Sequence, residues 1–205
     1  MENNQGKYKS YYINGYSISI IETPKHYWSE RQSSLLKYLY DIKSSLTNRK
    51  ILILFDTTGL CSIFISLFGG YVTTFLEEHS SFVEKNIDVN LQENKPNFIC
   101  VDQSKYDYII ISEAIYSNND LFNKIFHRIN QYSNPETKII LTIRKMFWEN
   151  EMFLQKSYTN QLDILSHFPK NYSRKQMTSF STKENIVFEL QKQKVLWIEE
   201  NHPIF

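Results

Sequence analysis

Three short polar segments of this 205-residue sequence have the residue types that bind a ligand or move a proton. They are Asp56–Gly59, the pair Glu77 and Glu78, and Ser112–Tyr116, in which an acid and a phenol stand three residues apart. Backbone N–H groups at the start of a helix can bind a polar ligand. Carboxylates can accept hydrogen bonds from a sugar diol, and a glutamate beside a reacting nitrogen can orient it or take its proton.

Each segment also has an ordinary structural interpretation. Turn residues at strand ends are usually polar because they contact water, which favours a structural role for Asp56 and Thr57 taken alone. Glu77 and Glu78 more often begin a solvated helix than bind a ribose. Glu113 is different because it follows apolar residues that should be buried, where an acid is costly unless it has a task.

The pattern around these segments predicts alternating strands and helices. Apolar runs typical of strands buried on both faces occupy residues 51–55, 71–76, 97–101, 106–111 and 138–143. Helical spacing of apolar residues predicts helices over 30–46, 60–68, 81–91, about 118–129, and within 149–167. Residues 178–180 and 186–190 are predicted as a closing pair of strands. This alternation implies right-handed βαβ units and a central parallel sheet, to which the closing pair adds an antiparallel strand.

The predicted topology brings the three polar segments together. In parallel sheets with helices on both faces, ligands bind outside the carboxyl ends of the strands. Residues 55–59, 76–79 and 112–117 each follow such an end. We therefore expect Gly59 and Glu113 to border one common hollow.

The ends of the chain predict two appendages to a single domain that spans residues 1–205. Residues 7–21 alternate around Asn14-Gly15, a dipeptide favoured in tight hairpin turns, and are predicted to form an N-terminal hairpin. Residues 195–205 form a C-terminal tail, interpreted as an extra strand or clasp, with a partner-docking segment as the alternative. There is no low-complexity linker that would mark a second domain.

Composition argues against several classes of protein. The net charge of +1 does not indicate a long phosphate-tracking surface, although direct contact with nucleic acid through a local patch stays open. Two cysteines without a CxxC pair, and five histidines without a His-x-x-x-His pair, predict no metal site. No apolar run of 18 residues and no signal-peptide pattern occur, so we expect no membrane partner and a cytoplasmic location. The motifs GxGxxG, GK[ST] and GxSxG are absent. Their absence argues against a dinucleotide-binding oxidoreductase, a P-loop protein and a hydrolase with a nucleophile elbow, respectively.

The order of these pieces resembles the seven-stranded, S-adenosylmethionine-dependent methyltransferases. The run KYDYIIISEAIYS at 105–117 is similar to the branch of protein methyltransferases that carries an acid-x-x-aromatic signature after strand four. This branch contains lysine and histidine protein methyltransferases. Asn86–Asn90, Thr58–Leu60 and Trp28 add weaker similarity. The resemblance implies an α/β fold: a Rossmann-like seven-stranded methyltransferase sheet with helices on both faces and an N-terminal hairpin.

The resemblance also implies roles for individual residues. As catalytic residues, Glu113 orients or deprotonates the target nitrogen, and Tyr116 lines the channel and excludes water. The implied cofactor is S-adenosylmethionine, with Glu77 at its ribose and Asp102 near its adenine. The full set of implied cofactor-binding residues is Trp28, Asp56, Gly59, Glu77 and Asp102.

The chain departs from the family at the end of the first strand of the predicted parallel sheet and in the loop that follows it. Ile53 stands where the family has an acid, and Phe55 and Thr57 stand where it has glycines. Two functions are therefore open. One is methyl transfer from S-adenosylmethionine to a histidine or lysine nitrogen of a ribosomal or translation protein. The alternative is a catalytically inactive binding protein of the same fold, a translation or dormancy factor on the ribosome. The expected partner is accordingly a protein substrate or the ribosome.

Overall fold

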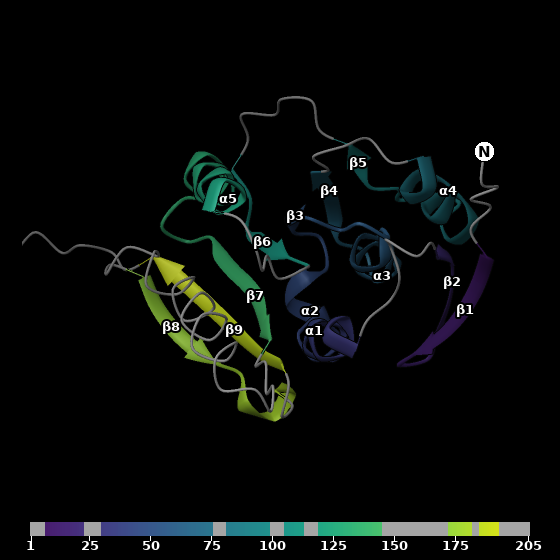
Figure 1. The fold of residues 1–205 in the computed structure, drawn as a ribbon, viewed down its shortest axis with the longest axis horizontal. Helices are drawn as coiled ribbons and strands as arrows, with labels where there is room; N and C mark the ends of the chain where they lie inside the picture. The colour runs from purple at the N-terminus through teal and green to yellow at the C-terminus, as the bar shows by residue number, and fades with distance from the viewer. Residues whose placement is uncertain are drawn as a thin grey trace, which may run out of the picture.

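We analysed a computed structural model of the protein (Figure 1). The structure describes residues 7–22, 30–75, 81–98, 105–112, 119–144, 172–181 and 185–192. The predicted helix within 149–167 and the tail at 195–205 lie outside these residues. Among the residues described, no helix is both long enough and apolar enough to cross a membrane.

A single sheet of seven strands organises the described part of the chain. Its order is β5-β4-β3-β6-β7-β9-β8. The strands are β3 (Lys50–Leu54), β4 (Tyr71–Phe75), β5 (Asn97–Phe98), β6 (Tyr108–Ile111), β7 (Lys138–Arg144), β8 (Tyr172–Gln176) and β9 (Asn185–Lys192). The strands from β5 to β7 run parallel, whereas β9 is antiparallel to both of its neighbours. The predicted parallel sheet with an antiparallel closing strand is confirmed.

Helices cover both faces of this sheet (Figure 1). They are α1 (Glu30–Asp41), α2 (Lys43–Leu46), α3 (Leu60–Leu67), α4 (Ser81–Asn90) and α5 (Asn119–Tyr132). The helix predicted over 30–46 is interrupted at Ile42, which has a non-helical φ/ψ of −94° and 13°, and so becomes α1 and α2.

The alternation of side chains along β3 divides the core into two clusters, one on each face. Ile51 and Ile53 belong to the first cluster, together with apolar residues of α1, α3 and α4. Leu52 and Leu54 belong to the second, together with residues of α5. All four side chains are fully buried, which explains why the strand is apolar at each position from Ile51 to Leu54 rather than at alternate positions.

The N-terminal hairpin is confirmed as a separate two-stranded antiparallel sheet. It consists of β1 (Lys7–Ile13) and β2 (Tyr16–Glu22). The turn residues Asn14 and Gly15 have φ angles of 47° and 91°, as the tight hairpin turn requires. Ile18 and Ile20 are fully buried against the first cluster, so the hairpin is packed onto the domain.

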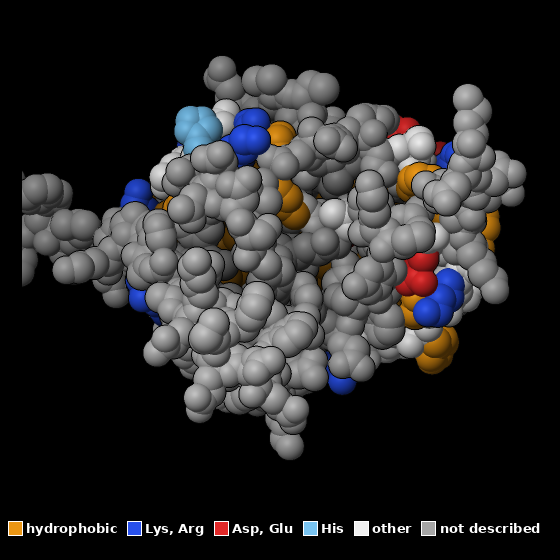
Figure 2. All heavy atoms as spheres, viewed as in Figure 1, with side chains coloured by type: hydrophobic (Ala, Val, Ile, Leu, Met, Phe, Trp, Pro, Cys, Tyr) orange, Lys and Arg blue, Asp and Glu red, His pale blue; other side chains and the backbone are white. Residues whose placement is uncertain are grey.

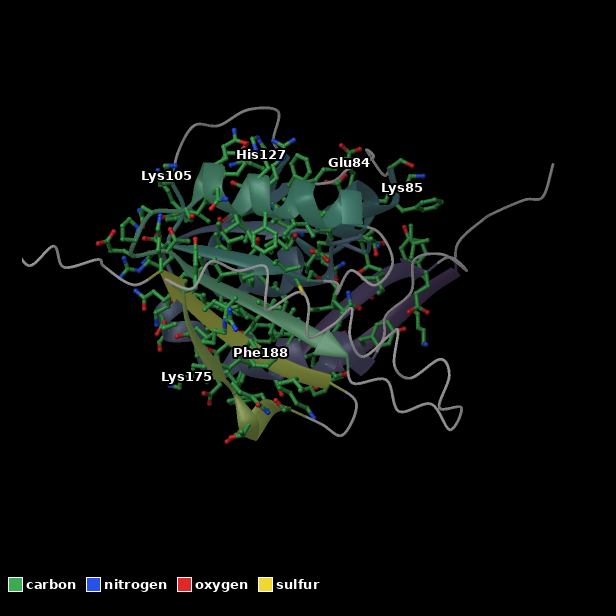
Figure 3. All side chains as sticks on the ribbon, turned by 60° about the vertical axis from the view of Figure 1, so that its left-hand side comes forward. Glu84, Lys85, Lys105, His127, Lys175 and Phe188 are labelled. Atoms are coloured by element: carbon green, nitrogen blue, oxygen red, sulfur yellow. The ribbon has the colours of Figure 1, made fainter. Side chains whose placement is uncertain are left out.

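The prediction of a strand at 178–180 is wrong. Thr178–Phe180 forms a single 3-10 turn, η1, and the strand that pairs with β9 is β8 at Tyr172–Gln176. Four of the five β8 residues are exposed at the sheet edge, including Lys175 (Figure 3). An edge strand can carry charged residues without apolar alternation, so periodicity does not reveal it.

The Gly69-Gly70 pair closes α3 and turns the chain into β4. Gly69 has a φ of 85°, which disfavours other residues. At Gly70, an added Cβ would lie 2.5 Å from Ile65 Cγ2 and 3.0 Å from Ile51 Cδ1. The helix and the strand therefore approach each other so closely here that only a hydrogen fits between them.

We predict that Gly70→Ala lowers the free energy of unfolding by about 1–3 kcal/mol, because the new methyl group overpacks the contact between α3 and β3. The loss is measured by urea denaturation. Ser44→Ala is the control, because Ser44 is exposed on α2 and its substitution should stay within about 0.5 kcal/mol. Equal stability of the two variants would contradict the prediction.

Candidate functional site

The carboxyl ends of β3 and β6 meet at one edge of the sheet, as the sequence predicts. The Ser112 N–H, just beyond β6, donates to the Leu54 carbonyl oxygen at 3.1 Å. Its Oγ lies 3.5 Å from Asp56 Oδ1 and 3.2 Å from Cys61 Sγ. Ser112, the last described residue before Glu113, therefore lies beside residues 55–59, which we call the first loop.

A buried carboxylate holds the first loop in place. The Asp56 side chain is fully buried and accepts hydrogen bonds from the Ser62 N–H at 2.7 Å, the Ser62 hydroxyl at 2.6 Å and, at 3.4 Å, the Cys61 N–H. These donors lie in the first turn of α3. Asp56 thus accepts hydrogen bonds from N–H groups that would otherwise lack a partner in the first turn of the helix.

The backbone N–H groups at the start of α3 already have partners inside the protein. Gly59 N–H donates to the Asp56 carbonyl oxygen at 3.1 Å, and Leu60 N–H donates to Thr58 Oγ1 at 3.4 Å. The next two N–H groups are those that donate to the Asp56 carboxylate. The expectation that free N–H groups here await a polar ligand is wrong for residues 59–62, because a side chain of the chain itself satisfies them.

The Asp56 carboxylate also links neighbouring strands. Ser62 Oγ lies 2.7 Å from the Thr74 hydroxyl on β4, and Ser112, just beyond β6, has its Oγ 3.5 Å from Asp56 Oδ1. Polar groups at the ends of β4, β3 and β6 are thereby connected beneath α3. Burial raises the pKa of Asp56, and this outweighs the hydrogen bonds from Ser62 and Cys61, which lower it.

Phe55 keeps the backbone conformation of a glycine although it carries a ring. Its φ is 60°, in the left-handed region that costs a residue with a side chain roughly 1–2 kcal/mol. The ring is half-buried against the second cluster, on the α5 face of the sheet. Gly59 lies against α4 on the opposite face, so the Phe55 ring does not cover Gly59.

Gly59 has a structural reason to be glycine. Its φ is 76°, and an added Cβ would lie 3.1 Å from Val83 Cγ1 and 3.7 Å from Ile87 Cγ1 of α4. Both the turn and the packing of α4 therefore require it. Contact between Gly59 and a cofactor stays a prediction.

An aromatic ring that sequence reasoning did not single out lies at the end of β4. Phe75 is half-buried, and the guanidinium carbon of Arg128 on α5 lies 4.3 Å from its ring centroid. Lys or Arg and His side chains lie at the surface over α5 (Figure 2). The sequence shows only a phenylalanine at the end of a predicted strand. That position alone does not tell whether the ring lies at the surface or in the core.

Five of the seven predicted site residues lie outside the described part of the chain. They are Trp28, Glu77, Asp102, Glu113 and Tyr116. Their roles stay predictions. Of the remaining two, Asp56 directs its carboxylate into the fold and Gly59 packs on α4.

Two groups of the first loop and the α3 start, the N–H groups of residues 59–62 and the Asp56 carboxylate, are not open to S-adenosylmethionine. The N–H groups at the start of α3 are used internally, and the Asp56 carboxylate is buried and bonded, so neither is available to a ribose or an amino-acid group. Any such contacts would come from residues such as Glu77 and Asp102. Within the described ranges, no cluster of three or more His, Cys, Asp or Glu side chains could hold a metal ion.

The order of the strands, the parallel central part of the sheet and the meeting of the strand ends define the class of fold. The chain has the fold of S-adenosylmethionine-dependent methyltransferases. It is similar to a 16S rRNA methyltransferase of T. thermophilus, solved with AdoMet and guanosine, with a TM-score of 0.65, 12% identity and coverage of 93% of this chain and 51% of that chain. It is also similar to a SAM-dependent methyltransferase from Agrobacterium tumefaciens, with a TM-score of 0.60, 13% identity and coverage of 94% and 72%.

The sequence resembles that of one particular protein methyltransferase. The chain is 29% identical over 118 residues to EEF1A lysine methyltransferase 3 of Xenopus tropicalis, which covers 53% of this chain and 52% of the relative. The chain therefore spans about half the length of this curated relative. No protein-family model matches it. The predicted resemblance to S-adenosylmethionine-dependent protein methyltransferases and the predicted Rossmann-like fold are confirmed.

We predict that Asp56→Asn removes a pH dependence of stability. Because the pKa of Asp56 is raised by burial, the folded protein retains this proton above the ordinary value of 3.8. The carboxyl group then contributes most stability while it is neutral, and this contribution falls as the pH rises from the ordinary value through the raised pKa. The free energy of unfolding of the wild type, relative to Asp56→Asn, should accordingly decrease with rising pH.

Urea unfolding of both proteins at a series of pH values measures this difference. Ser44→Ala is the control, because Ser44 is exposed on α2 and its substitution removes no titratable group. A wild-type advantage that grows with pH would contradict the prediction.

Proposed function

We propose that the protein is an S-adenosylmethionine-dependent methyltransferase that modifies a nitrogen of a protein side chain. The observation that supports the proposal is the position of Ser112, the residue before the acid-x-x-aromatic signature: its N–H donates to the Leu54 carbonyl oxygen and its Oγ lies 3.5 Å from Asp56 Oδ1. The similarity to a lysine methyltransferase supports lysine as the first target to test, with histidine second.

The proposed reaction needs a neutral nitrogen. A lysine must lose its proton, or an imidazole must present its unprotonated nitrogen, before it can attack a methyl group. Glu113, which follows Ser112 directly, would accept that proton or orient the nitrogen, and Tyr116 would exclude water. The bound cofactor supplies the methyl group as a sulfonium. The protein supplies mainly alignment, which can lower the barrier by several kcal/mol.

The proposed substrate is a ribosomal or translation protein in the cytoplasm. Two considerations support it: the resemblance to the histidine and lysine branch, and the name of the curated relative, which gives EEF1A as that enzyme's substrate. Direct binding to nucleic acid is not part of the proposal, because the net charge of the chain is only +1.

A second candidate is a catalytically inactive protein of the same fold that binds the ribosome. One observation favours it: the first loop is closed by Asp56 and carries Phe55 where the family has a glycine. The lysine methyltransferase relative favours the enzyme instead. Binding of S-adenosylmethionine separates the two candidates.

We predict that the wild type binds S-adenosylmethionine with a dissociation constant of about 1–100 μM and transfers its methyl group. Glu113→Ala should lower the rate of methyl transfer about 10²–10⁴-fold, because the target nitrogen loses its base. Binding is measured by calorimetry. Transfer is measured with radiolabelled S-adenosylmethionine and a fraction of ribosomes and translation factors, followed by mass spectrometry of the labelled residue.

Glu93→Ala is the control, since Glu93 is exposed and lies after α4. An unchanged rate in Glu113→Ala would remove Glu113 from the mechanism. Failure of the wild type to bind millimolar S-adenosylmethionine would overturn the enzyme and favour the inactive protein.

We further predict that Phe55→Gly leaves the affinity for S-adenosylmethionine within about threefold, because the ring packs on the α5 face and away from Gly59. Its stability should fall, since lost apolar burial outweighs the relieved backbone strain. Phe126→Ala also removes a half-buried ring from the second cluster. It is the control that shows how far the loss of such a ring alone lowers the stability. Affinity that appears only in Phe55→Gly would instead mean that the wild-type ring blocks the site.

A further inference from the structure

Asn86 connects three segments that are distant in the sequence. It lies on α4 and is fully buried. Its Oδ1 accepts the Ile21 N–H of β2 at 2.6 Å, and its Nδ2 donates to the Thr58 carbonyl oxygen of the first loop at 2.9 Å. A single side chain thus joins the hairpin, α4 and the first loop, and both halves of its amide are used.

Asn90, one helical turn further along α4, makes a similar bond to the hairpin but none described to the loop. Its Oδ1 accepts the Ser19 N–H at 2.8 Å, and its Nδ2 donates to the Ser19 carbonyl oxygen at 2.6 Å. Nδ2 also donates to the Asn86 carbonyl oxygen at 2.6 Å. The two asparagines present amide groups to β2 much as a neighbouring strand would. They therefore differ in the bond of Asn86 to Thr58 and in burial, because Asn86 is fully buried and Asn90 is half-buried.

That bond fixes one peptide plane of the first loop. The Thr58 carbonyl and the Gly59 N–H belong to the same planar peptide group. Asn86 holds the carbonyl, and the Asp56 carbonyl oxygen accepts the N–H at 3.1 Å. Rotating this plane would break both bonds within a buried region, which is costly because the freed polar groups cannot reach water.

We infer that Asn86 is a positioning residue, which ties the Thr58 carbonyl to the backbone of β2 and makes the geometry of the first loop depend on the docked hairpin. The hairpin then helps to shape the site at the carboxyl ends of β3 and β6, which we call the strand-end site. The expected effect on cofactor affinity rests on the proposed function, whereas the effect on the loop does not.

The experiment compares Asn86→Asp with Asn90→Asp. In each variant a side-chain oxygen can still accept the N–H group of β2, but the amide donor is lost. Only Asn86→Asp therefore loses a bond to the first loop. We expect the Gly59 amide to exchange with solvent at least about tenfold faster in Asn86→Asp and within about twofold of wild type in Asn90→Asp, as measured by NMR. Equal acceleration in both variants, or none in Asn86→Asp, would overturn the inference.

A second measurement uses the wild type alone and decides the matter if Asn86→Asp does not fold. Native-state hydrogen exchange is followed at increasing urea concentration. If the loop depends on the hairpin, the Ile21 and Gly59 amides should open in one event, with the same dependence on urea. Opening of Gly59 while Ile21 stays closed would overturn the inference.

Affinity for S-adenosylmethionine then tests the functional consequence. Asn86→Asp should weaken binding at least about tenfold and leave the KM for the protein substrate within about twofold, while Asn90→Asp changes neither. Unchanged cofactor affinity in Asn86→Asp would overturn this consequence. A wild type that binds no S-adenosylmethionine would refute the proposed function, and the exchange measurements would still decide the role of Asn86.

Discussion

The arrangement of the strand-end site depends on one buried carboxylate. Asp56 is fully buried, accepts hydrogen bonds from the first turn of α3, and touches Ser112 at the end of β6. Through Ser62 it also reaches Thr74 on β4. Three neighbouring strands and a helix therefore converge on one buried carboxyl group. Removing a carboxyl group from water is costly, and these donors offset part of the cost, although burial still raises its pKa.

The same carboxylate explains how the first loop keeps its shape with so little glycine. In phosphate- and nucleotide-binding loops, backbone N–H groups at a helix start are left for a ligand. Here Asp56 and Thr58 satisfy those groups, and Phe55 adopts the left-handed conformation despite its side chain. Hydrogen bonds and the packing of the Phe55 ring hold a conformation that glycine would adopt without strain.

Amide side chains of α4, together with apolar packing of Ile18 and Ile20, hold the hairpin on the domain, and β2 does not pair with the described strands of the seven-stranded sheet. Asn86 and Asn90 satisfy backbone groups of β2 that would otherwise be unpaired and shielded from water. Because Asn86 also reaches the first loop, the hairpin contributes to the same edge as the ends of β3 and β6. The order of the strands and the convergence of their carboxyl ends at this edge agree with the methyltransferase fold.

The sequence by itself determined the alternation of strands and helices, the hairpin turn at Asn14-Gly15, and the meeting of the strand ends, because apolar periodicity and turn chemistry are local signals. It did not reveal β8, since an exposed edge strand needs no apolar pattern. Only the tertiary structure decided that Asp56 turns inward, that the Phe55 ring lies on the α5 face, and that Asn86 reaches the first loop. Those outcomes depend on which distant donors and rings surround each side chain, and no local pattern along the chain records its neighbours in space.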